Sequence, residues 1–352
     1  MTYRPSDLLR GRAIPNAVLR ALPKTDLHVH LDGSLRPATF CELGRKMQLA
    51  VPEDPAAVRP STPDLLACLQ TPVNLERAAR ELAEDAAVHG VRVLEVRFCP
   101  LLHTEQGLDA DGAVAAVQWG LDLVAKRTGL RTGIIVTGLR TLDAARSLEL
   151  AKLAVHWKGR GVVAFDLSGA ETERPAAKHS EAFHHAINHN LPVTCHAGEN
   201  CGPESIHAAI HRCGAVRIGH GTRLEEDPDL MAYVADHRIP LEICLSSNLH
   251  SGAVAALADH PLRIYHEAGL RLCLNTDNTL LLRTDIVREL RLAVDTFDLT
   301  LLQLEAILLD GIKSAFLPEQ TARECIESAL QEFAHIREEH QLDQLVVGRK
   351  SA

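Results

Sequence analysis

Two histidines separated by one residue, His28 and His30, are the first feature of this sequence that could do chemistry. They lie in LPKTDLHVHLDGSL, a segment whose composition favours a β-strand. Residues i and i+2 of a strand point to the same face, so both imidazoles can bind one ion. Because a lone HxH pair often binds no metal, the prediction of a metal site needs further donors.

Two later segments supply such donors at the ends of expected strands, His196 in CHAGE and Asp277 in LNTDN. With His28 and His30 they would form a set of three nitrogen ligands and one oxygen ligand. A catalytic zinc ion uses such a set and keeps one position open for water, whereas Mg²⁺ prefers more carboxylates. We therefore expect one zinc ion per chain.

Two further groups are not needed as ligands and are candidates for acid–base catalysis. Glu199 follows His196 by three residues and could donate a proton to the substrate. His220, in the segment RIGHG, could take a proton from the attacking water or hold the resulting hydroxide in place. Together with a zinc ion, which lowers the pKa of water, these groups predict a hydrolase.

Short apolar or β-branched runs alternate with longer stretches of helical period along the chain. We expect eight strands, at Thr25–Gly33, Arg92–Pro100, Arg131–Leu139, Gly161–Gly169, Leu191–Glu199, Val216–Leu224, Pro240–Asn248 and Gly269–Asn278. The candidate chemical groups fall at the ends of four of these strands, which is where barrel enzymes place catalytic residues.

Amphipathic helices are expected between the strands, at Asn74–His89, Ala113–Lys126, Leu142–Trp157, Glu181–Asn188, Pro203–Cys213, Ala253–Ala268 and Asp285–Thr296. The pattern predicts an α/β fold, a closed (β/α)8 TIM barrel, in a single domain spanning 1–352. Additional C-terminal helices at Leu301–Lys313 and Pro318–Glu339 should pack outside the barrel or on one end. No GxGxxG follows the first strand, which disfavours a dinucleotide-binding fold.

The bulk composition excludes several other classes. The formal net charge is -9 and no cluster of Lys and Arg stands out, so no nucleic-acid partner is expected. No segment has the length of a membrane span or a signal peptide. The nine Cys lack CxxC spacing and are expected to be reduced thiols of a cytoplasmic protein. The oligomeric state, monomer or homo-oligomer, is left open.

The motifs named above, with LEICLSSN and FDLSGAE, resemble in their order the signature segments of the adenosine deaminase family, within the amidohydrolase superfamily. The resemblance extends from about Leu22 to Pro318. It implies a zinc-dependent β/α barrel that adds water to C6 of an aminopurine and releases ammonia.

The resemblance also implies a role for each site residue. The zinc ligands would be four residues, His28, His30, His196 and Asp277. Glu199 would protonate the purine N1, and His220 would act as the base toward water. Asp32 would bind a sugar hydroxyl, and the backbone of Gly169 would meet the purine N3.

Three positions depart from the family pattern. Asn278 replaces an Asp that binds the purine N7, although an amide can still donate to N7. The segment Ser61–Leu69, expected to roof the active site, is short and lacks an aromatic residue. Ala170 stands where an acidic residue is common.

These features leave the exact substrate open. The first hypothesis is deamination of adenosine or 2′-deoxyadenosine, which Asp32 favours. The alternative is a related aminopurine, namely adenine, a 5′-modified adenosine, an aminofutalosine or an N6-substituted AMP. A noncatalytic barrel is disfavoured because a binding protein would not need both Glu199 and His220. A hydrolase of amide, lactone or phosphoester bonds is the remaining alternative.

Overall fold

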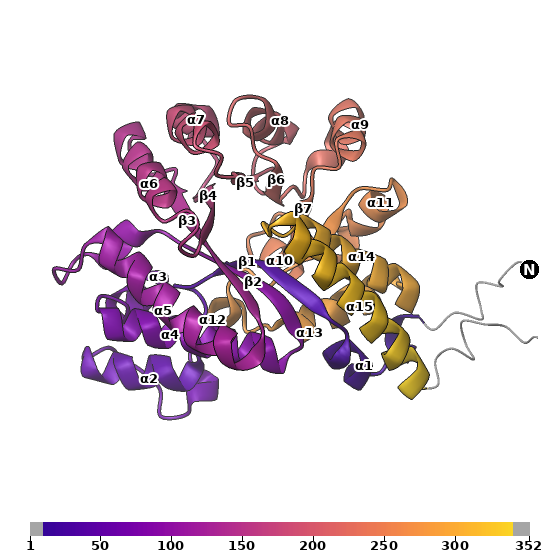
Figure 1. Cartoon of the computed structure of the whole chain (residues 1–352), viewed down its shortest axis with the longest axis horizontal. Helices are drawn as coiled ribbons and strands as arrows, with labels where there is room; N and C mark the ends of the chain where they lie inside the picture. Colours follow the sequence, from indigo (N-terminus) through magenta and orange to yellow (C-terminus); the bar gives the residue numbers. More distant parts are fainter. Residues whose placement is uncertain (1–9, 341–352) are drawn as a thin grey trace, which may run out of the picture.

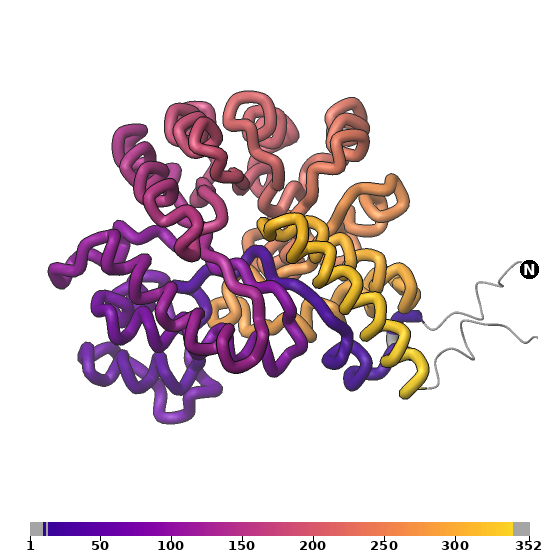
Figure 2. The backbone as a smooth tube through the Cα atoms, viewed as in Figure 1, coloured from indigo at the N-terminus to yellow at the C-terminus, as the bar shows by residue number. Residues whose placement is uncertain are grey.

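The structure is a computed structural model that describes residues 10–340, and its strands form a parallel barrel enclosed by helices (Figures 1 and 2). The strands are β1 (Lys24–His30), β2 (Val91–Phe98), β3 (Arg131–Leu139), β4 (Val162–Ser168), β5 (Thr194–Ala197), β6 (Arg217–His220), β7 (Leu241–Ile243) and β8 (Leu272–Leu274).

Hydrogen bonding joins β1 to β4 in chain order and β5 to β8 in chain order, with each neighbouring pair parallel. Two single bridges close the circle, Phe165 with Val193 between β4 and β5, and Val29 with Asp277 between β1 and β8. The predicted (β/α)8 barrel is therefore confirmed. The second bridge also brings the segment with His28 and His30 next to the segment with Asp277.

The helices of the described residues are α1 (Asn16–Ala21), α2 (Pro37–Lys46), α3 (Thr62–Cys68), α4 (Pro72–Val88), α5 (Ala110–Thr128), α6 (Ala144–His156), α7 (Ser180–Asn188), α8 (Pro203–His211), α9 (Pro228–Asp236), α10 (Leu245–His250), α11 (Leu262–Glu267), α12 (Thr279–Leu282), α13 (Ile286–Phe297), α14 (Leu301–Ser314) and α15 (Glu319–Glu339). Figure 1 shows α6 to α9 arranged side by side around the outside of the strands.

The interval between β1 and β2 holds α2 and α3 in addition to the crossover helix α4. The helix α4 begins where the Thr71 side chain accepts a hydrogen bond from the amide of Asn74 and Pro72 occupies the first turn. It packs closely on α5, where a Cβ at Gly120 would lie 2.3 Å from the Glu76 carbonyl oxygen. Glycine at this position therefore permits the contact.

The helices α14 and α15 and the linker between them lie against the amino-terminal end of the barrel. The backbone amide of Phe316 donates to Glu95 Oε1 at 2.5 Å, and the Arg217 guanidinium lies 4.0 Å from the centroid of the Phe316 ring. A small apolar cluster fills this end, with Leu27, Val93 and Cys273 packed against Ala315 and Leu317. The predicted extra C-terminal helices thus seal the end opposite the candidate site.

The second half of the barrel differs from the prediction in its element lengths. The expected strand Pro240–Asn248 ends at Ile243, and Leu245–His250 is the helix α10. The buried Glu289 carboxylate accepts hydrogen bonds from the amide and hydroxyl of Ser246, which stabilises the first turn of α10. A helix replaces the strand here because a distant carboxylate caps it, and no local pattern shows that contact.

Two helix predictions also differ from the structure. The expected helix Ala253–Ala268 is helical mainly over Leu262–Glu267, because Pro261 precedes its regular part. The helix α9 was not predicted, although Asp227 and Pro228 form a standard start signal, with the Asp227 side chain accepting from the amide of Leu230.

Candidate active site

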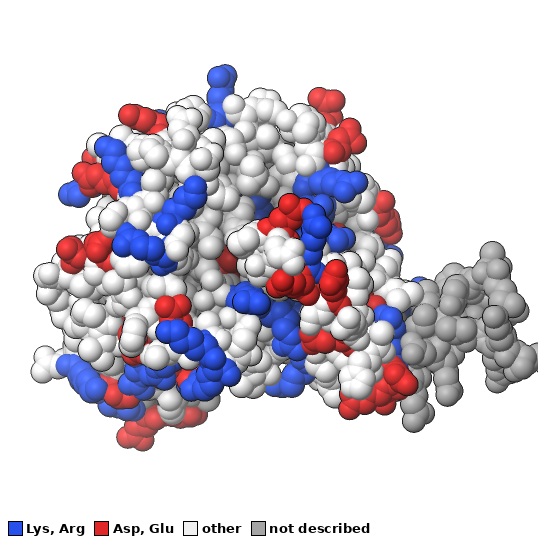
Figure 3. Space-filling view, in the orientation of Figure 1, with Lys and Arg blue, Asp and Glu red and all other residues white. Residues whose placement is uncertain are grey.

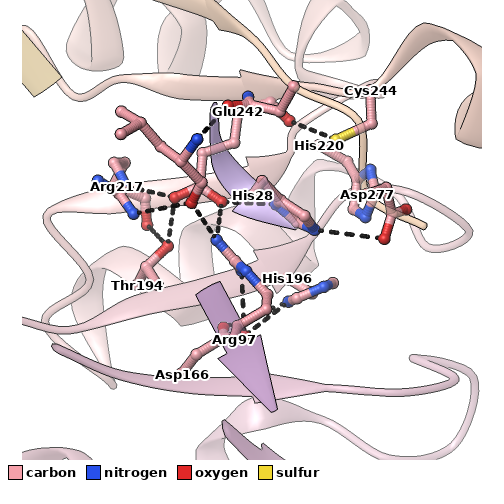
Figure 4. A network of polar contacts seen from close by, with 12 residues as sticks. His28, Arg97, Asp166, Thr194, His196, Arg217, His220, Glu242, Cys244 and Asp277 are labelled. Carbon is pink, nitrogen blue, oxygen red and sulfur yellow. Dashed lines mark hydrogen bonds and ion pairs between the residues drawn. The ribbon is translucent and has the colours of Figure 1, made fainter. Parts of the chain in front are cut away.

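Side chains from three barrel strands meet at the carboxyl ends of those strands (Figure 4). His28 and His30 come from β1, His196 comes from β5, and Asp277 follows β8. The Nε2 atoms of His30 and His196 lie 3.2 Å apart, and Asp277 Oδ1 lies 3.5 Å from His30 Nε2 and 3.9 Å from His28 Nε2. The structure thus brings together all four residues predicted as metal ligands.

The separations and the donor atoms fit a metal ion. Ligand atoms of a tetrahedral zinc site lie about 3.3–3.4 Å apart when each Zn–N bond is about 2.0–2.1 Å. The Nε2 atom of His28 is buried and has no hydrogen-bond partner among the described residues. A buried imidazole nitrogen without a partner is costly unless it binds something, so this lone pair marks a ligand position.

Carboxylates hold two of these imidazoles from behind. His28 Nδ1 donates to Glu242 Oε2 at 2.6 Å, and His196 Nδ1 lies 3.2 Å from the carboxylate of Asp166. Arg97 joins both carboxylates, with Nη2 at 2.7 Å from Glu242 and Nη1 at 3.1 Å from Asp166 (Figure 4). These contacts place the proton of each histidine on Nδ1 and leave Nε2 free to bind a metal.

None of these three supporting residues was predicted from the sequence. The available signal was weak: a charged residue at the centre of an apolar strand, as in LEVRF, AFDLS and LEIC. Arg217 on β6 continues the same buried network, since it pairs with both Glu242 and Glu95. Buried charges of this kind are expensive unless paired, and here the pairs extend below the metal-binding residues.

The pKa values of the ligands follow from burial and from these contacts. Burial lowers the pKa of His28 well below its ordinary value and lowers that of His30 to about 3. Burial also acts to lower the pKa of His196, but Asp166 more than offsets this and the pKa is raised. Burial opposes the charge of Asp277, yet the neighbouring histidines hold its pKa below the usual range. Neutral His28 and His30 beside an ionised Asp277 are in the protonation states that bind a metal.

Two site residues adopt a left-handed backbone conformation that is uncommon outside glycine. The φ angles are 64° at His220 and 61° at Asp277, the residues that end or follow β6 and β8. Asp277 is held in place because its amide donates to the His28 carbonyl at 2.8 Å and its carbonyl accepts from the His30 amide at 2.6 Å. Such strain costs about 1–3 kcal/mol and is found preferentially at functional sites.

A glycine on β6 leaves room for the imidazoles. A Cβ at Gly219 would lie 3.0 Å from His28 Cε1 and 3.1 Å from the Cα of His196. Glycine at position 219, next to His220, therefore allows the imidazoles of His28 and His196 to pack closely against β6.

The two residues predicted for acid–base catalysis lie together at the edge of the ligand cluster. His220 Nε2 is 3.7 Å from Glu199 Oε2, and His220 belongs with His28 and Asp277 to a group whose donor atoms all lie within 4.8 Å of one another. His220 is buried, whereas Glu199 is partly exposed. This arrangement places a carboxylate and an imidazole where both can reach a small substrate.

The loop that carries Glu199 is anchored by Glu171, a residue that the sequence analysis did not single out. The buried Glu171 carboxylate accepts hydrogen bonds from the backbone amides of Gly198 at 3.2 Å, Glu199 at 3.1 Å and Cys201 at 3.2 Å. The signal was an acidic residue two positions after Gly169. The neighbouring Ala170 is exposed and has no carboxylate.

The residues predicted to bind substrate follow β1, β4 and β8 in the chain. Asp32 follows β1, and burial with a smaller effect of Asp277 raises its pKa to about 6. Gly169 follows β4 with φ of 99° and is exposed. The Nδ2 of Asn278 donates to Asp277 Oδ1 at 2.5 Å. A Cβ at Gly33 would overlap Asn278 Oδ1, at 1.7 Å, so a side chain at position 33 would displace this amide.

The predicted roof segment Ser61–Leu69 forms the helix α3, with a capping box between Ser61 and Asp64. Its end is tied to the residues that follow β2. His103 Nδ1 donates to the Leu69 carbonyl at 2.9 Å, and Gln70 Nε2 donates to the Leu102 carbonyl at 2.9 Å. The segment is therefore a short helix whose end is held by hydrogen bonds to the residues after β2.

A parallel β/α barrel with histidines and an aspartate clustered at the carboxyl ends of its strands is the architecture of a metal-dependent hydrolase. The family model for adenosine deaminase matches residues 23–332. This chain belongs to the adenosine deaminase family.

Curated relatives and solved structures agree with this assignment. The adenosine deaminase of Mycobacteroides abscessus is 38% identical over 332 residues, covering 84% of this chain and 91% of the relative. An N6-methyl-AMP deaminase from Arabidopsis thaliana has a TM-score of 0.80 and 26% identity, with 90% of this chain and 100% of that chain covered. A zinc-bound amidohydrolase from Burkholderia ambifaria shares the fold, with a TM-score of 0.86, 24% identity and coverage of 98% and 100%.

The surface and the helices give two further observations. On the face shown in Figure 3, Lys and Arg side chains lie among Asp and Glu side chains. Within residues 10–340, no helix has both the length and the apolar character that crossing a bilayer requires.

Proposed function

We infer that this chain is a cytoplasmic, zinc-dependent enzyme that converts adenosine or 2′-deoxyadenosine to inosine or 2′-deoxyinosine and releases ammonia. The observation that carries the proposal is the convergence of four metal-binding side chains with Glu199 and His220 at one end of the barrel. Membership of the adenosine deaminase family supports the same reaction.

The metal would be held by His28, His30, His196 and Asp277. Three imidazoles and one carboxylate are a donor set that suits zinc better than magnesium. A bound zinc ion would lower the pKa of the attacking water toward neutrality. Glu242, Asp166 and Arg97 would fix the imidazoles so that the unprotonated Nε2 atoms face the ion.

The remaining residues would orient the purine and move protons. Asp32 would bind a sugar hydroxyl, the backbone of Gly169 would meet N3, and Asn278 would donate to N7. Glu199 would deliver a proton to N1 as the water oxygen bonds to C6. Transfer of the remaining hydroxyl proton to N6 and breakage of the C6–N6 bond would then release ammonia and leave the 6-oxopurine.

An N6-substituted AMP is the second candidate, because an N6-methyl-AMP deaminase shares the fold at 26% identity. The amide at Asn278 and the short helix α3 are the features that bear on this choice. The same site would then release methylamine in place of ammonia.

A substrate panel tests the proposal directly. Zinc-loaded protein would be assayed by ultraviolet absorbance and by amine release with adenosine, 2′-deoxyadenosine, adenine, a 5′-modified adenosine, an aminofutalosine analogue and N6-methyl-AMP. The proposal expects adenosine or 2′-deoxyadenosine to have the highest kcat/KM. A higher value for N6-methyl-AMP would move the assignment to the second candidate, and turnover of no compound would refute both.

A further inference from the structure

A buried chain of hydrogen bonds leads from His220 away from the metal-binding residues. Asn248 Nδ2 lies 3.1 Å from His220 Nδ1, and Asn248 Oδ1 lies 3.2 Å from His260 Nε2. The chain ends where the backbone amide of Leu262 donates to His260 Nδ1 at 3.1 Å. The side chains of His220, Asn248 and His260 are at most 3% exposed, so bulk water does not compete for these contacts.

The last contact fixes the protonation state of His260. A backbone amide can only donate, so His260 Nδ1 must present a lone pair to Leu262. Neutral His260 therefore carries its proton on Nε2. Burial, with a smaller effect of His220, lowers the pKa of His260 to about 3, which keeps the ring neutral at ordinary pH.

The protonated Nε2 of His260 in turn orients the Asn248 amide. A donor at His260 Nε2 requires an acceptor opposite, so the oxygen of Asn248 faces His260. The NH2 group of Asn248 then faces His220 and can only donate to it.

We propose that Asn248 and His260 are positioning residues that hold neutral His220 as the Nε2–H tautomer. His220 Nδ1 accepts from Asn248, so the proton of the ring stands on Nε2, the atom that lies 3.7 Å from Glu199 Oε2. This tautomer is opposite to that of His28 and His196, whose Nδ1 atoms face carboxylates. The carboxylate partners thus leave Nε2 of His28 and His196 free to bind a metal. The amide partner leaves Nε2 of His220 protonated, so that it can donate a hydrogen bond.

The proposal rests on the function inferred above and refines one role in it. An imidazole that presents its single N–H to the reaction centre can donate a hydrogen bond to the attacking oxygen or to Glu199. It does not remove a proton from water in that state, because the accepting lone pair is on the side of Asn248. Of the two roles that the sequence left open for His220, the structure favours holding the oxygen over acting as the base.

Long-range ¹H–¹⁵N correlation of histidine ring nitrogens reads the tautomer without reference to activity. The zinc-loaded full chain would be labelled with ¹⁵N-histidine, and His220→Gln would identify the His220 signals by their loss. The proposal expects a bare Nδ1 and a protonated Nε2 for His220 and for His260. A protonated Nδ1 on His220 in the wild-type protein would overturn it, whatever the variants do.

Two matched variants test the residues that set the tautomer. In Asn248→Asp, a carboxylate accepts from His220 Nδ1–H, so the tautomer should reverse and kcat should fall at least about tenfold with bound zinc unchanged. An unchanged tautomer in this variant would remove Asn248 from the proposal.

His260→Gln keeps an N–H donor toward Asn248 Oδ1, whereas His260→Met removes it. The proposal expects Gln to retain most of the wild-type kcat and the His220 tautomer, and Met to lose both. Equal behaviour of the two folded variants would show that His260 only fills space. If adenosine is not turned over but the tautomers are as expected, the function fails and the positioning role stands.

Discussion

His30 Nε2 and His196 Nε2 lie 3.2 Å apart although the residues are 166 positions apart in the chain. One comes from β1 and the other from β5, so the contact reaches across the barrel. Two imidazole nitrogens at this distance serve best as neighbouring ligands of one ion. The loss of a single ligand should therefore weaken zinc binding measurably.

Asp277→Ala should weaken zinc binding by at least about 100-fold. Removal of a residue that only hydrogen-bonds to a metal ligand typically costs roughly 10–100-fold. The variant removes an oxygen ligand and leaves the three histidines in place. Metal content after dialysis against a weak chelator, measured by atomic emission, gives the result. Asp236→Ala, at an exposed position on α9, is the control. Equal metal content in both variants would exclude Asp277 as a ligand.

Glu199→Gln should retain zinc and lose about 10²–10⁴-fold in kcat, because the amide cannot deliver a proton to the purine ring. The carboxylate lies outside the ligand cluster, and its Oε2 atom is 3.7 Å from His220 Nε2. Steady-state kinetics and metal analysis on the same sample separate the two effects. Glu181→Gln, exposed on α7, should match the wild type. Near-normal turnover in Glu199→Gln would assign the proton transfer to another group.

Glu171→Ala should lower kcat about 10- to 100-fold, because three backbone amides of the Glu199 loop lose their acceptor. The variant should also lose about 1–3 kcal/mol of stability, since the buried Gly198 amide and the two partly buried amides lose their acceptor. Kinetics and urea unfolding would be compared with Glu181→Ala. Loss of stability with full activity would limit Glu171 to a structural role.

Asn278→Asp should change the order of kcat/KM among purines by about tenfold or more. The amide donates to Asp277 at 2.5 Å, and a second carboxylate there would repel Asp277 and could not donate to N7 unless protonated. The substrate panel described above is the measurement. A uniform loss for every purine would indicate an effect on the metal-binding carboxylate alone, without contact to the ring.

Lys24 should make stability rise between about pH 7 and pH 10. Burial, with Arg92 and Arg20, lowers its pKa from 10.5 to about 7 in the folded protein. Below pH 7 both states are protonated, and above it the unfolded state binds more protons, so the free energy of unfolding increases with pH. The slope is at most about 1.4 kcal/mol per pH unit.

The comparison for Lys24 is Lys24→Met, measured by urea unfolding at pH 7 and pH 9.5. The variant lacks the titrating group and should lack this rise. It should also be less stable, because the carbonyls of Arg20 and His89 lose the Nζ donor. Parallel pH profiles for both proteins would contradict the assigned pKa.

The sequence predicted the barrel and the residues that meet at the carboxyl ends of its strands, because both depend on local patterns. Strand ends in a barrel meet at one edge, so His28, His196 and Asp277 could be placed together without coordinates. The supporting residues Arg97 and Glu171 could not, because their roles depend on contacts between strands or loops whose register no local pattern specifies.

The same reason explains the errors in the second half of the barrel. The expected strand continued past Ile243 to Asn248, but the Glu289 carboxylate from α13 stabilises the first turn of α10 there. The hydrogen-bond chain that starts at His220 likewise runs through Asn248 of α10 and His260 to the first residue of α11, Leu262. Tertiary contacts decided these features, and local propensity did not.

Titration of metal-free protein with zinc, followed by ammonia release from adenosine, tests the central claim most directly. The account predicts that activity rises in proportion to added zinc and reaches a plateau at about one equivalent per chain. Full activity of rigorously metal-free protein, or no adenosine turnover after zinc is bound, would contradict it.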